Sequence, residues 1–375
     1  MTAIGDSKLF KKRLGDFGVN VYQGCEHGCR FCYAPAQPGV RAQPFWKGKS
    51  QADWGTVFMP RPGLLDALVD ELRTFTPAAA QKKATPWGEG RILVSFLCDP
   101  YQPLELKEQN TRRVLEALLE AGHKVRIQTR SDLVMRDFEL LAKYPAQVRL
   151  GTSLPHLNDE LSAVLEPKAP SPSKRLIMLN EASKLGIPVY VAIAPFMPFH
   201  TVTVLDEVVQ AILPLKPTEI FCEPLNPKGH AVEMVLAAIA ERYPAEAALI
   251  HSYDDAAWAQ WTYKLLAFGV SKYADKGFIA WPDTGRAWAK HLSGPEAAFL
   301  EQFLPPSTVA DNPKQNEGGK SLTPGKKAWV TMRKKYTPDQ IHQRASAAAK
   351  KAHQTMRRKL TTKSTRGAAN LQKPR

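Results

Sequence analysis

Apolar residues along this chain fall into short runs of strand length that alternate with amphipathic helical patterns. The run over residues 91–97, for example, is followed by a helical pattern near 109–121. Strands that alternate with helices pair in parallel through right-handed crossovers. Six such units predict an α/β fold, a partial (β/α)6 barrel of the TIM type. The expected strands cover residues 19–22, 91–97, 124–129, 148–153, 188–194 and 219–222.

The segments between and beyond these strands predict the domain organisation. Helices are expected near 109–121, 132–143, 173–185, 205–213 and 232–242. Residues 35–90 are rich in proline, glycine and tryptophan, which indicates an insertion, with one helix around 64–72. Further helices are expected within 245–304, one of them at 256–267. The chain therefore divides into a leader (1–18), a core (19–304) and a linker with a tail (305–375).

Positive charge is concentrated at one end of the sequence. The chain carries 51 Lys and Arg against 36 Asp and Glu, a net charge of +15, and residues 305–375 hold 17 of the basic residues but only three acidic ones. This tail is expected to be largely disordered, with one helix at about 338–359 that Thr337 and Gln340 would cap. Basic residues on several faces of that helix predict contact with nucleic acid. A solvated basic tail is the alternative.

Compartment and assembly follow from what the sequence lacks. No run approaches the ~18 apolar residues that a bilayer-spanning helix needs, and the first 20 residues show no signal-peptide pattern. Five cysteines in 375 residues are too few for a disulfide framework. We expect a cytoplasmic, monomeric protein without a membrane segment.

Three of the five cysteines, Cys25, Cys29 and Cys32, stand within eight residues of one another, directly after the first expected strand. Clustered thiolates select zinc, copper or iron–sulfur centres. A structural zinc site needs four protein ligands, usually two close pairs, and no second pair follows, although His27 is available as a fourth ligand. Three thiolates on a [4Fe–4S] cube leave one iron open for chemistry. The triplet therefore favours an iron–sulfur cluster, with a zinc site as the alternative.

Polar or reactive residues also follow the other expected strands. The carboxyl ends of barrel strands gather functional groups at one face, so these residues are expected to lie near the cysteines. They are Cys98-Asp99, Thr129-Arg130, Thr152-Ser153, Ala194-Pro195 and Cys222-Glu223.

The cysteine motif carries a family resemblance. Cys-x3-Cys-x2-Cys with the aromatic Phe31 before the last cysteine resembles the radical S-adenosylmethionine (SAM) superfamily. The longer run over residues 20–34, NVYQGCEHGCRFCYA, is similar to its spore photoproduct lyase-like branch. The stretches CDPYQPLE (98–105), EPKAPS (166–171) and VAIAP (191–195) agree with that branch. The resemblance covers about residues 19–240 and leaves out the tail.

This resemblance implies a mechanism and a set of ligands. Cys25, Cys29 and Cys32 would hold a [4Fe–4S] cluster, whose fourth iron binds SAM. One electron, from a donor such as a flavodoxin or ferredoxin, would cleave SAM to a 5′-deoxyadenosyl radical that abstracts hydrogen from the substrate. The implied SAM contacts are Phe31, Thr129, Arg130, Thr152, Ser153, Glu166 and Ala194. Arg130 stands where the spore enzyme has a lysine, which keeps the charge but not the geometry.

Cys98 follows the strand that carries the hydrogen-donating cysteine in spore photoproduct lyase, although the spacing to the next aspartate differs. The resemblance thus implies hydrogen return by Cys98, with Tyr101 as a relay. Buried structural thiols are the alternative for Cys98 and Cys222.

Three hypotheses follow. The first is a radical SAM enzyme, lyase-like, acting on nucleic acid. The second keeps the radical chemistry with a protein or small-molecule substrate. The third is a nucleic-acid-binding protein with a zinc or sensing iron–sulfur site and no turnover.

Overall fold

The computed structural model describes residues 2–7, 12–84, 89–226, 230–282 and 290–303. Eight strands form one sheet in the order β1-β2-β5-β6-β7-β8-β9-β10. All neighbours are parallel except the antiparallel edge pair β1 and β2. The strands are β1 (Gly5–Asp6), β2 (Phe17–Val19), β5 (Ile92–Val94), β6 (Val125–Gln128), β7 (Val148–Ser153), β8 (Val189–Phe196), β9 (Ile220–Pro224) and β10 (Phe278–Ala280). The prediction of an α/β fold built as a partial barrel is confirmed.

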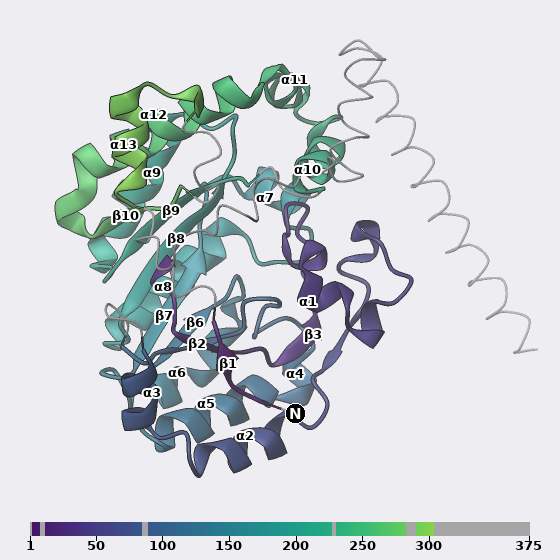
Figure 1. Cartoon of the computed structure of the whole chain (residues 1–375), viewed down its shortest axis with the longest axis vertical. Helices are drawn as coiled ribbons and strands as arrows, with labels where there is room; N and C mark the ends of the chain where they lie inside the picture. Colours follow the sequence, from purple (N-terminus) through teal and green to yellow (C-terminus); the bar gives the residue numbers. More distant parts are fainter. Residues whose placement is uncertain (1, 8–11, 85–88, 227–229, 283–289, 304–375) are drawn as a thin grey trace, which may run out of the picture.

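Helices cover the outer face of this sheet (Figure 1). The apolar residues of β6 and β7, such as Val125, Ile127 and Leu150, join the main core with helix residues such as Leu118 and Met178. The helices that follow the strands are α5 (Asn110–Glu120), α6 (Phe138–Leu141), α7 (Asp159–Leu165), α8 (Pro172–Lys184), α9 (Val202–Ile212) and α10 (Ala231–Ile239). Helices α11 (Pro244–Ser252), α12 (Asp255–Tyr273) and α13 (Gly294–Glu301) complete the described C-terminal part.

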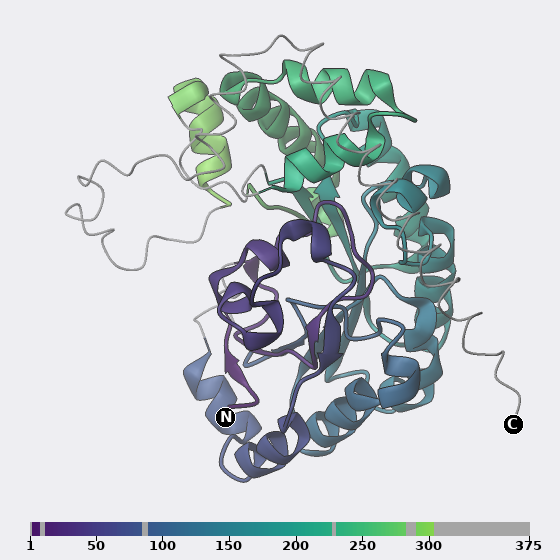
Figure 2. The same ribbon diagram turned by 90° about the vertical axis from the view of Figure 1, so that its right-hand side faces the viewer.

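The chain between β2 and β5 crosses the concave side of the fold. Figure 2 shows this purple N-terminal segment in the middle of an arc of helices that runs from blue to green. It contains the two-stranded sheet of β3 (Tyr22–Gly24) and β4 (Phe58–Pro60) and the short helix α1 (Pro38–Arg41). Helices α2 (Leu64–Leu72) and α3 (Pro77–Lys83) then lead to β5. The helix predicted around 64–72 is confirmed.

Two element predictions were wrong. The first strand was expected over residues 19–22, but β2 ends at Val19, and Tyr22 begins β3 in the second sheet. Asn20 ends the strand, because its side chain is tied to the segment after β5. Its Oδ1 accepts hydrogen bonds from the backbone N–H groups of Phe96 and Leu97, each at 3.0 Å.

The second error concerns residues 245–304, where only helices were expected. Strand β10 pairs with β9 in this region, with Phe278 beside Ile220. A strand of three residues is too short to show a period of two in the sequence.

Other predictions changed in detail or stay untested. The helix expected over 132–143 is a 3-10 helix, η5 (Asp132–Asp137), followed by α6. The domain boundaries stay predictions, and the tail with its helix at 338–359 lies outside the described residues. No helix in the described ranges is both long and apolar enough to span a bilayer.

Candidate functional site

The cysteine loop follows β3 and lies between the sheet and the insertion. Cys25 is 8% exposed and packs in one apolar cluster with Trp46 and Trp54, against which Cys32 also packs. Cys29 instead packs against the cluster of Phe31, α7 and α10. The three cysteines thus pack against two different apolar clusters, Cys25 buried and Cys29 and Cys32 partly exposed.

Two glycines give this loop its path. Gly24 has φ +74°, and a Cβ there would lie 2.0 Å from the carbonyl oxygen of Val57. Gly28 has φ +64° and faces Gly55, whose own Cβ would lie 2.7 Å from the Cα of Gly28. A side chain at Gly24 or Gly55 would push residues 55–58, which lead into β4, away from the loop.

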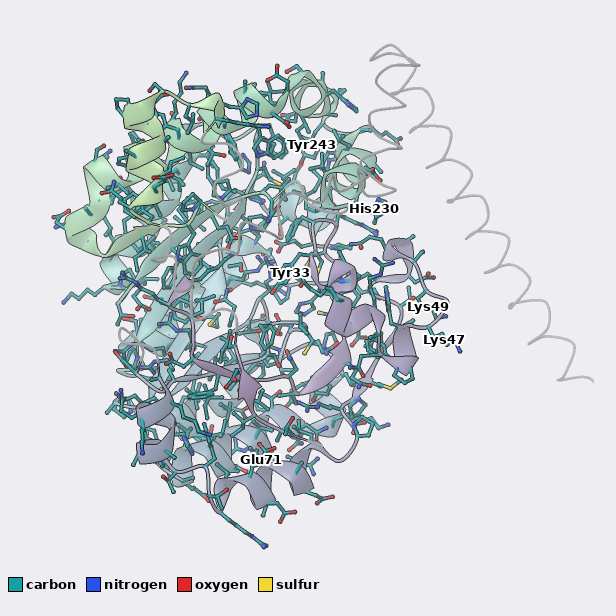
Figure 3. The ribbon with its side chains drawn as sticks, viewed as in Figure 1. Tyr33, Lys47, Lys49, Glu71, His230 and Tyr243 are labelled. Carbon is teal, nitrogen blue, oxygen red and sulfur yellow. The ribbon has the colours of Figure 1, made fainter. Side chains whose placement is uncertain are left out.

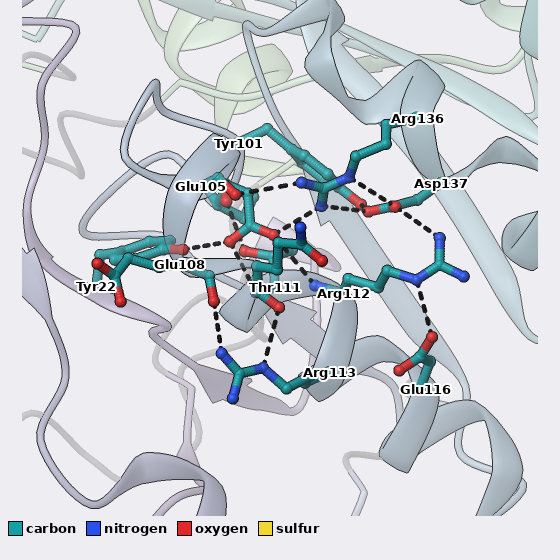
Figure 4. Close-up of polar contacts among 12 residues, drawn as sticks. Tyr22, Tyr101, Glu105, Glu108, Thr111, Arg112, Arg113, Glu116, Arg136 and Asp137 are labelled. Atoms are coloured by element: carbon teal, nitrogen blue, oxygen red, sulfur yellow. Dashed lines mark hydrogen bonds and ion pairs between the residues drawn. The ribbon is translucent and has the colours of Figure 1, made fainter.

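Residues 98–105, which follow β5, hold the cysteine loop in place through hydrogen bonds. Gln102 accepts the N–H of Glu26 through Oε1 at 2.7 Å, and the Glu26 carboxylate accepts the N–H of Leu104 at 3.0 Å. Tyr22, just before the loop, donates its hydroxyl to the buried carboxylate of Glu105 (Figure 4). The loop is therefore held to the end of β5 on both sides of Cys25.

Three thiols in one loop are a donor set that fits a [4Fe–4S] cluster. Among the described residues no group of three His, Cys, Asp or Glu converges closely enough to hold one metal ion. A cube binds each thiolate through a different iron, so its ligands stand farther apart than those of zinc. Burial raises the pKa of Cys29 to about 12 and raises the pKa of Cys25 and Cys32 as well. Binding of iron therefore has to displace the thiol protons.

Asp99 joins the loop to the strand ends. Its carboxylate accepts the hydroxyl of Thr129 at 2.6 Å and the backbone N–H groups of Arg130 at 2.7 Å and Tyr101 at 2.9 Å. His27, between the first two cysteines, places Nδ1 3.4 Å from the same carboxylate. Nε2 of His27 is buried without a hydrogen-bond partner among the described residues.

Beside Asp99 lies a second buried charge network. Arg130 Nε donates to Glu166 Oε1 at 2.5 Å, and Arg175 Nη2 donates to Glu166 Oε2 at 2.7 Å. Burial alone would raise the pKa of Glu166, but the two guanidinium groups outweigh it and lower that pKa to about 2. Glu166 is thus a fixed carboxylate that orients Arg130.

Arg130 contacts two more of the residues predicted to bind SAM, Phe31 and Ala194. Its guanidinium lies over the Phe31 ring, 5.3 Å from the centroid, and Nη2 donates to the carbonyl oxygen of Ala194 at 3.3 Å. The backbone oxygen of Ser153 accepts from Arg175 Nη1 at 3.0 Å. Phe31, Arg130, Ser153, Glu166 and Ala194 therefore form one contact network, joined to Thr129 through Asp99.

Thr152 lies apart from this network. Side chains alternate along β7, and Val148 and Leu150 face the helix-covered core, so Thr152 points away from the side of Ser153. Only its backbone is available to a ligand on the inner face.

Cys98 packs against both the main core and the Trp46–Trp54 cluster that also contains Cys25. Burial raises its pKa to about 11, although Ser95 and the backbone of Tyr22 oppose the rise by hydrogen bonding. Cys98 is thus a protonated thiol. Cys222 is fully buried in the main core, where its sulfur has a packing role.

Tyr101 is fully buried, and its hydroxyl donates to Asp137 at 2.9 Å. Figure 4 shows it within a network of charged residues, where Arg136 bridges Glu105 and Asp137. This placement explains Tyr101 as a structural residue. The relay role stays a prediction that these contacts do not support.

Three residues of the site, Asp99, His27 and Arg175, were not predicted to bind the cluster or SAM. Asp99 was expected near the cysteines from its place after a strand, and His27 was named as an alternative zinc ligand. The contact of Arg175 with Glu166 gave no signal, because a buried arginine looks like any other helix arginine until its burial is known.

Residues 19–212, about half of the chain, match the family model described as the radical SAM superfamily. An uncharacterized protein of Acidianus two-tailed virus is 30% identical over 250 residues, which cover 64% of this chain and 78% of the relative. An uncharacterized protein of Methanocaldococcus jannaschii is 27% identical over 180 residues, 48% of this chain and 60% of the relative.

Solved structures are similar at a lower level. Streptococcus suis SuiB bound to S-adenosylmethionine is 15% identical, with a TM-score of 0.45, over 71% of this chain and 50% of SuiB. A mutant of spore photoproduct lyase is 13% identical, with a TM-score of 0.49, over 74% of this chain and 78% of the lyase. From the family match, this chain belongs to the radical SAM superfamily of enzymes, whose cofactors are a [4Fe–4S] cluster and SAM.

Proposed function

We propose that Cys25, Cys29 and Cys32 hold the cluster and that SAM binds between the cysteine loop and the strand ends. One observation carries this proposal: Asp99 links the cysteine loop, through His27, to the residues that follow β5 and β6. The SAM contacts proposed are the side chains of Phe31, Thr129, Arg130, Ser153 and Glu166 and the backbone of Thr152 and Ala194.

The protein's own part in this chemistry is to bind, orient and keep water out. When bound, the cluster and SAM supply a 5′-deoxyadenosyl radical that abstracts a hydrogen atom from the substrate. The guanidinium of Arg130 lies 5.3 Å from the centroid of the Phe31 ring, which brings a cation and an aromatic ring together where SAM is proposed to bind. Glu166 and Arg175 fix the position of that guanidinium.

For the substrate, the proposal is nucleic acid, in a lyase-like reaction. It is supported by composition, because the tail holds 17 basic and three acidic residues. A base in a duplex would have to leave the stack to reach the strand ends. Cys98, a protonated thiol under the cysteine loop, is proposed to return a hydrogen atom to the product radical, leaving a sulfur radical on Cys98.

The test measures SAM cleavage by the cluster-loaded enzyme in the presence of single-stranded DNA, ultraviolet-irradiated duplex DNA, transfer RNA, or a peptide and metabolite mixture. The proposal expects one nucleic acid to raise the rate of 5′-deoxyadenosine formation severalfold. Deuterium transfer from that nucleic acid into 5′-deoxyadenosine would identify it as substrate. Stimulation by the peptide or metabolite mixture alone would favour the second substrate class and overturn this one.

A further inference from the structure

Two walls of opposite charge enclose the cysteine loop. On one side, residues 33–61 contain four basic residues and one acidic residue. On the other, residues 231–254, which form α10 and α11, contain one basic residue and four acidic ones. Residues 1–304 as a whole are nearly neutral, with 34 basic and 33 acidic residues when the tail is left out. The two segments that pack around the cysteine loop therefore carry opposite net charge.

Residues 33–61, which we call the basic wall, form only a thin layer over Cys25. Trp46 and Trp54 contact each other edge-on, with ring centroids 5.3 Å apart, and pack in the same cluster as Cys25. Lys47 directly follows the buried Trp46, and Lys49 lies two residues further on. Figure 3 shows both lysines on the outer side of this segment, away from the sheet. One layer of aromatic side chains thus separates an exposed basic surface from the thiols.

The exposed cations of this wall are Arg41, Lys47 and Lys49. None of the three forms an ion pair or a side-chain hydrogen bond with another residue in the described ranges. The single acidic residue of the segment, Asp53, is used locally, since it accepts the N–H of Ser50 at 2.7 Å. These three charges therefore remain available to a partner, and we call them the basic cover.

The basic cover lies on the far side of the cysteine loop from the strand ends. The sheet side of the loop carries Asp99, Thr129 and Arg130, where SAM and substrate are proposed to bind. A molecule bound at Lys47 and Lys49 would therefore face the cysteine loop across Trp46 and Trp54 and not from the sheet side. That position suits a partner that exchanges electrons with the cluster.

We propose that the basic cover is the docking surface for an acidic one-electron carrier protein, which reduces the cluster through the layer of Trp46 and Trp54. The proposal rests on the assignment of the cluster to the three cysteines. The transfer moves one electron from the reduced carrier, which is oxidised, to the cluster, which is reduced. Complementary charge steers such an encounter, and the acidic wall of α10 and α11 repels the same carrier from the other side.

The experiment follows anaerobic reduction of the loaded cluster by stopped-flow absorbance. The reductant is either a flavodoxin of net negative charge, as the hydroquinone, or dithionite. The variant carries Arg41→Glu, Lys47→Glu and Lys49→Glu. The matched control reverses three exposed lysines elsewhere, with Lys82→Glu, Lys143→Glu and Lys174→Glu, so that both proteins have the same net charge.

The proposal expects the second-order rate constant with flavodoxin to fall at least tenfold at low salt in the cover variant and less than threefold in the control. Reduction by dithionite should change less than twofold in both. The wild-type rate with flavodoxin should fall as salt rises, and that of the cover variant should not. The milder pair Lys47→Gln and Lys49→Gln should give an intermediate rate, which separates a charge effect from misfolding.

Each other outcome overturns one defined statement. If dithionite reduces the cluster while flavodoxin is equally fast with the cover variant and the control, the docking site is wrong and the cluster assignment stands. If the cover variant loses binding of single-stranded DNA but keeps its flavodoxin rate, the surface serves nucleic acid instead. If the wild-type protein holds no reducible cluster, the proposed function itself fails.

Discussion

At the scale of single residues, Glu166 stands out because it is an ion in a fully buried place. It accepts hydrogen bonds from Arg130, Arg175 and the hydroxyl of Ser162, the last at 2.9 Å. A buried charge of this kind is tolerated only when its partners remain, and removal of one partner leaves the others unpaired. Glu166 therefore connects the stability of the fold to the shape of the site.

We predict that Glu166→Gln lowers the free energy of unfolding by about 3 kcal/mol at pH 7. The pKa of Glu166 is about 2 in the folded state against an ordinary value of 4.5. Its contribution is therefore complete above about pH 5 and is lost as the pH falls from 4.5 towards 2, because the unfolded carboxylate binds a proton first. Denaturant titrations of both proteins at pH 7, 5 and 3.5 measure this difference.

The difference between wild type and Glu166→Gln should shrink at pH 3.5. Glu160→Gln is the control, since Glu160 is 73% exposed and its ion pair is with Arg242, which is also exposed. A difference below 1 kcal/mol at pH 7, or one equal to that of Glu160→Gln, would show that the buried pair does not hold the site.

How far these residues were predictable depends on how local their signals are. The three cysteines stand within eight residues, so spacing alone indicated their chemistry. Phe31, Glu166 and Ala194 were expected from short motifs and Arg130 from its place after a strand, and Arg130 contacts the other three. Asp99 was expected near the cysteines, but its partners and those of Arg175 were not predictable, because they come from segments that only the folded sheet brings together. Whether Cys98 and Tyr101 act as predicted stays untested.

At the scale of elements, the cysteine loop depends on a close backbone contact with β4. Gly24 pairs with Phe58, and the loop turns immediately after that pair. The sequence showed a glycine before the first cysteine but not its contact. Likewise, the early end of β2 depends on hydrogen bonds from Asn20 to a segment 76 residues away, which no local pattern reveals.

We predict that Gly24→Ala prevents assembly of the cluster. The new Cβ would lie 2.0 Å from the Val57 carbonyl oxygen, at a residue whose φ is +74°. Gly39→Ala, in α1, is the control because nothing lies within 4 Å of its Cβ. Iron and sulfide content after anaerobic reconstitution measures the effect, and a Gly24→Ala protein with a full cluster would contradict the account of the loop.

The loops after β7 and β8 hold a second buried feature, the pair of His156 and His200, whose rings are tilted by 59° to each other. Their ring centroids lie 5.2 Å apart, and Phe196 and Phe199 also contact His200. Burial lowers the pKa of His200 to about 3 and that of His156 to about 4. Folding therefore requires both rings to stay neutral.

We predict that this pair makes the fold acid-sensitive. In the unfolded chain both histidines bind protons below about pH 6.5, so stability is lost as the pH falls from 6.5 towards 4. His200→Phe should reduce that loss by up to about 1.4 kcal/mol per pH unit. Denaturant titrations at pH 7, 6 and 5 measure the free energy of unfolding of each protein. His230→Gln, which changes an exposed histidine, is the control. Equal pH dependence of stability in wild type and His200→Phe would contradict the prediction.

At the scale of the whole molecule, charge is unevenly distributed along the sequence. The described ranges form a nearly neutral body with two oppositely charged segments around the cysteine loop, and the tail carries most of the excess charge. The α/β class and the partial barrel were predictable because the strand and helix periods repeat along the chain. Strand β10 was not, since its place beside β9 is set by the sheet rather than by its three residues.

We predict that truncation after Phe303 weakens binding of single-stranded DNA at least tenfold at low salt and flattens its salt dependence, because phosphate neutralisation releases counterions. Cleavage of SAM without nucleic acid should be unchanged. Fluorescence anisotropy of labelled DNA at several salt concentrations measures this. If the full-length and truncated proteins bind DNA with equal affinity and equal salt dependence, the tail does not contribute to nucleic-acid binding.

The most direct test of the central claim is the quantity of 5′-deoxyadenosine formed by anaerobically reconstituted protein with SAM and dithionite, with and without nucleic acid. The account predicts formation by the wild type and by Cys222→Ala, which removes a sulfur from the main core, and only background formation by Cys29→Ala. A loaded wild type that forms none under either condition, or a Cys29→Ala protein as active as wild type, would contradict it. A colourless protein that binds one zinc ion would contradict it equally and would favour a binding module.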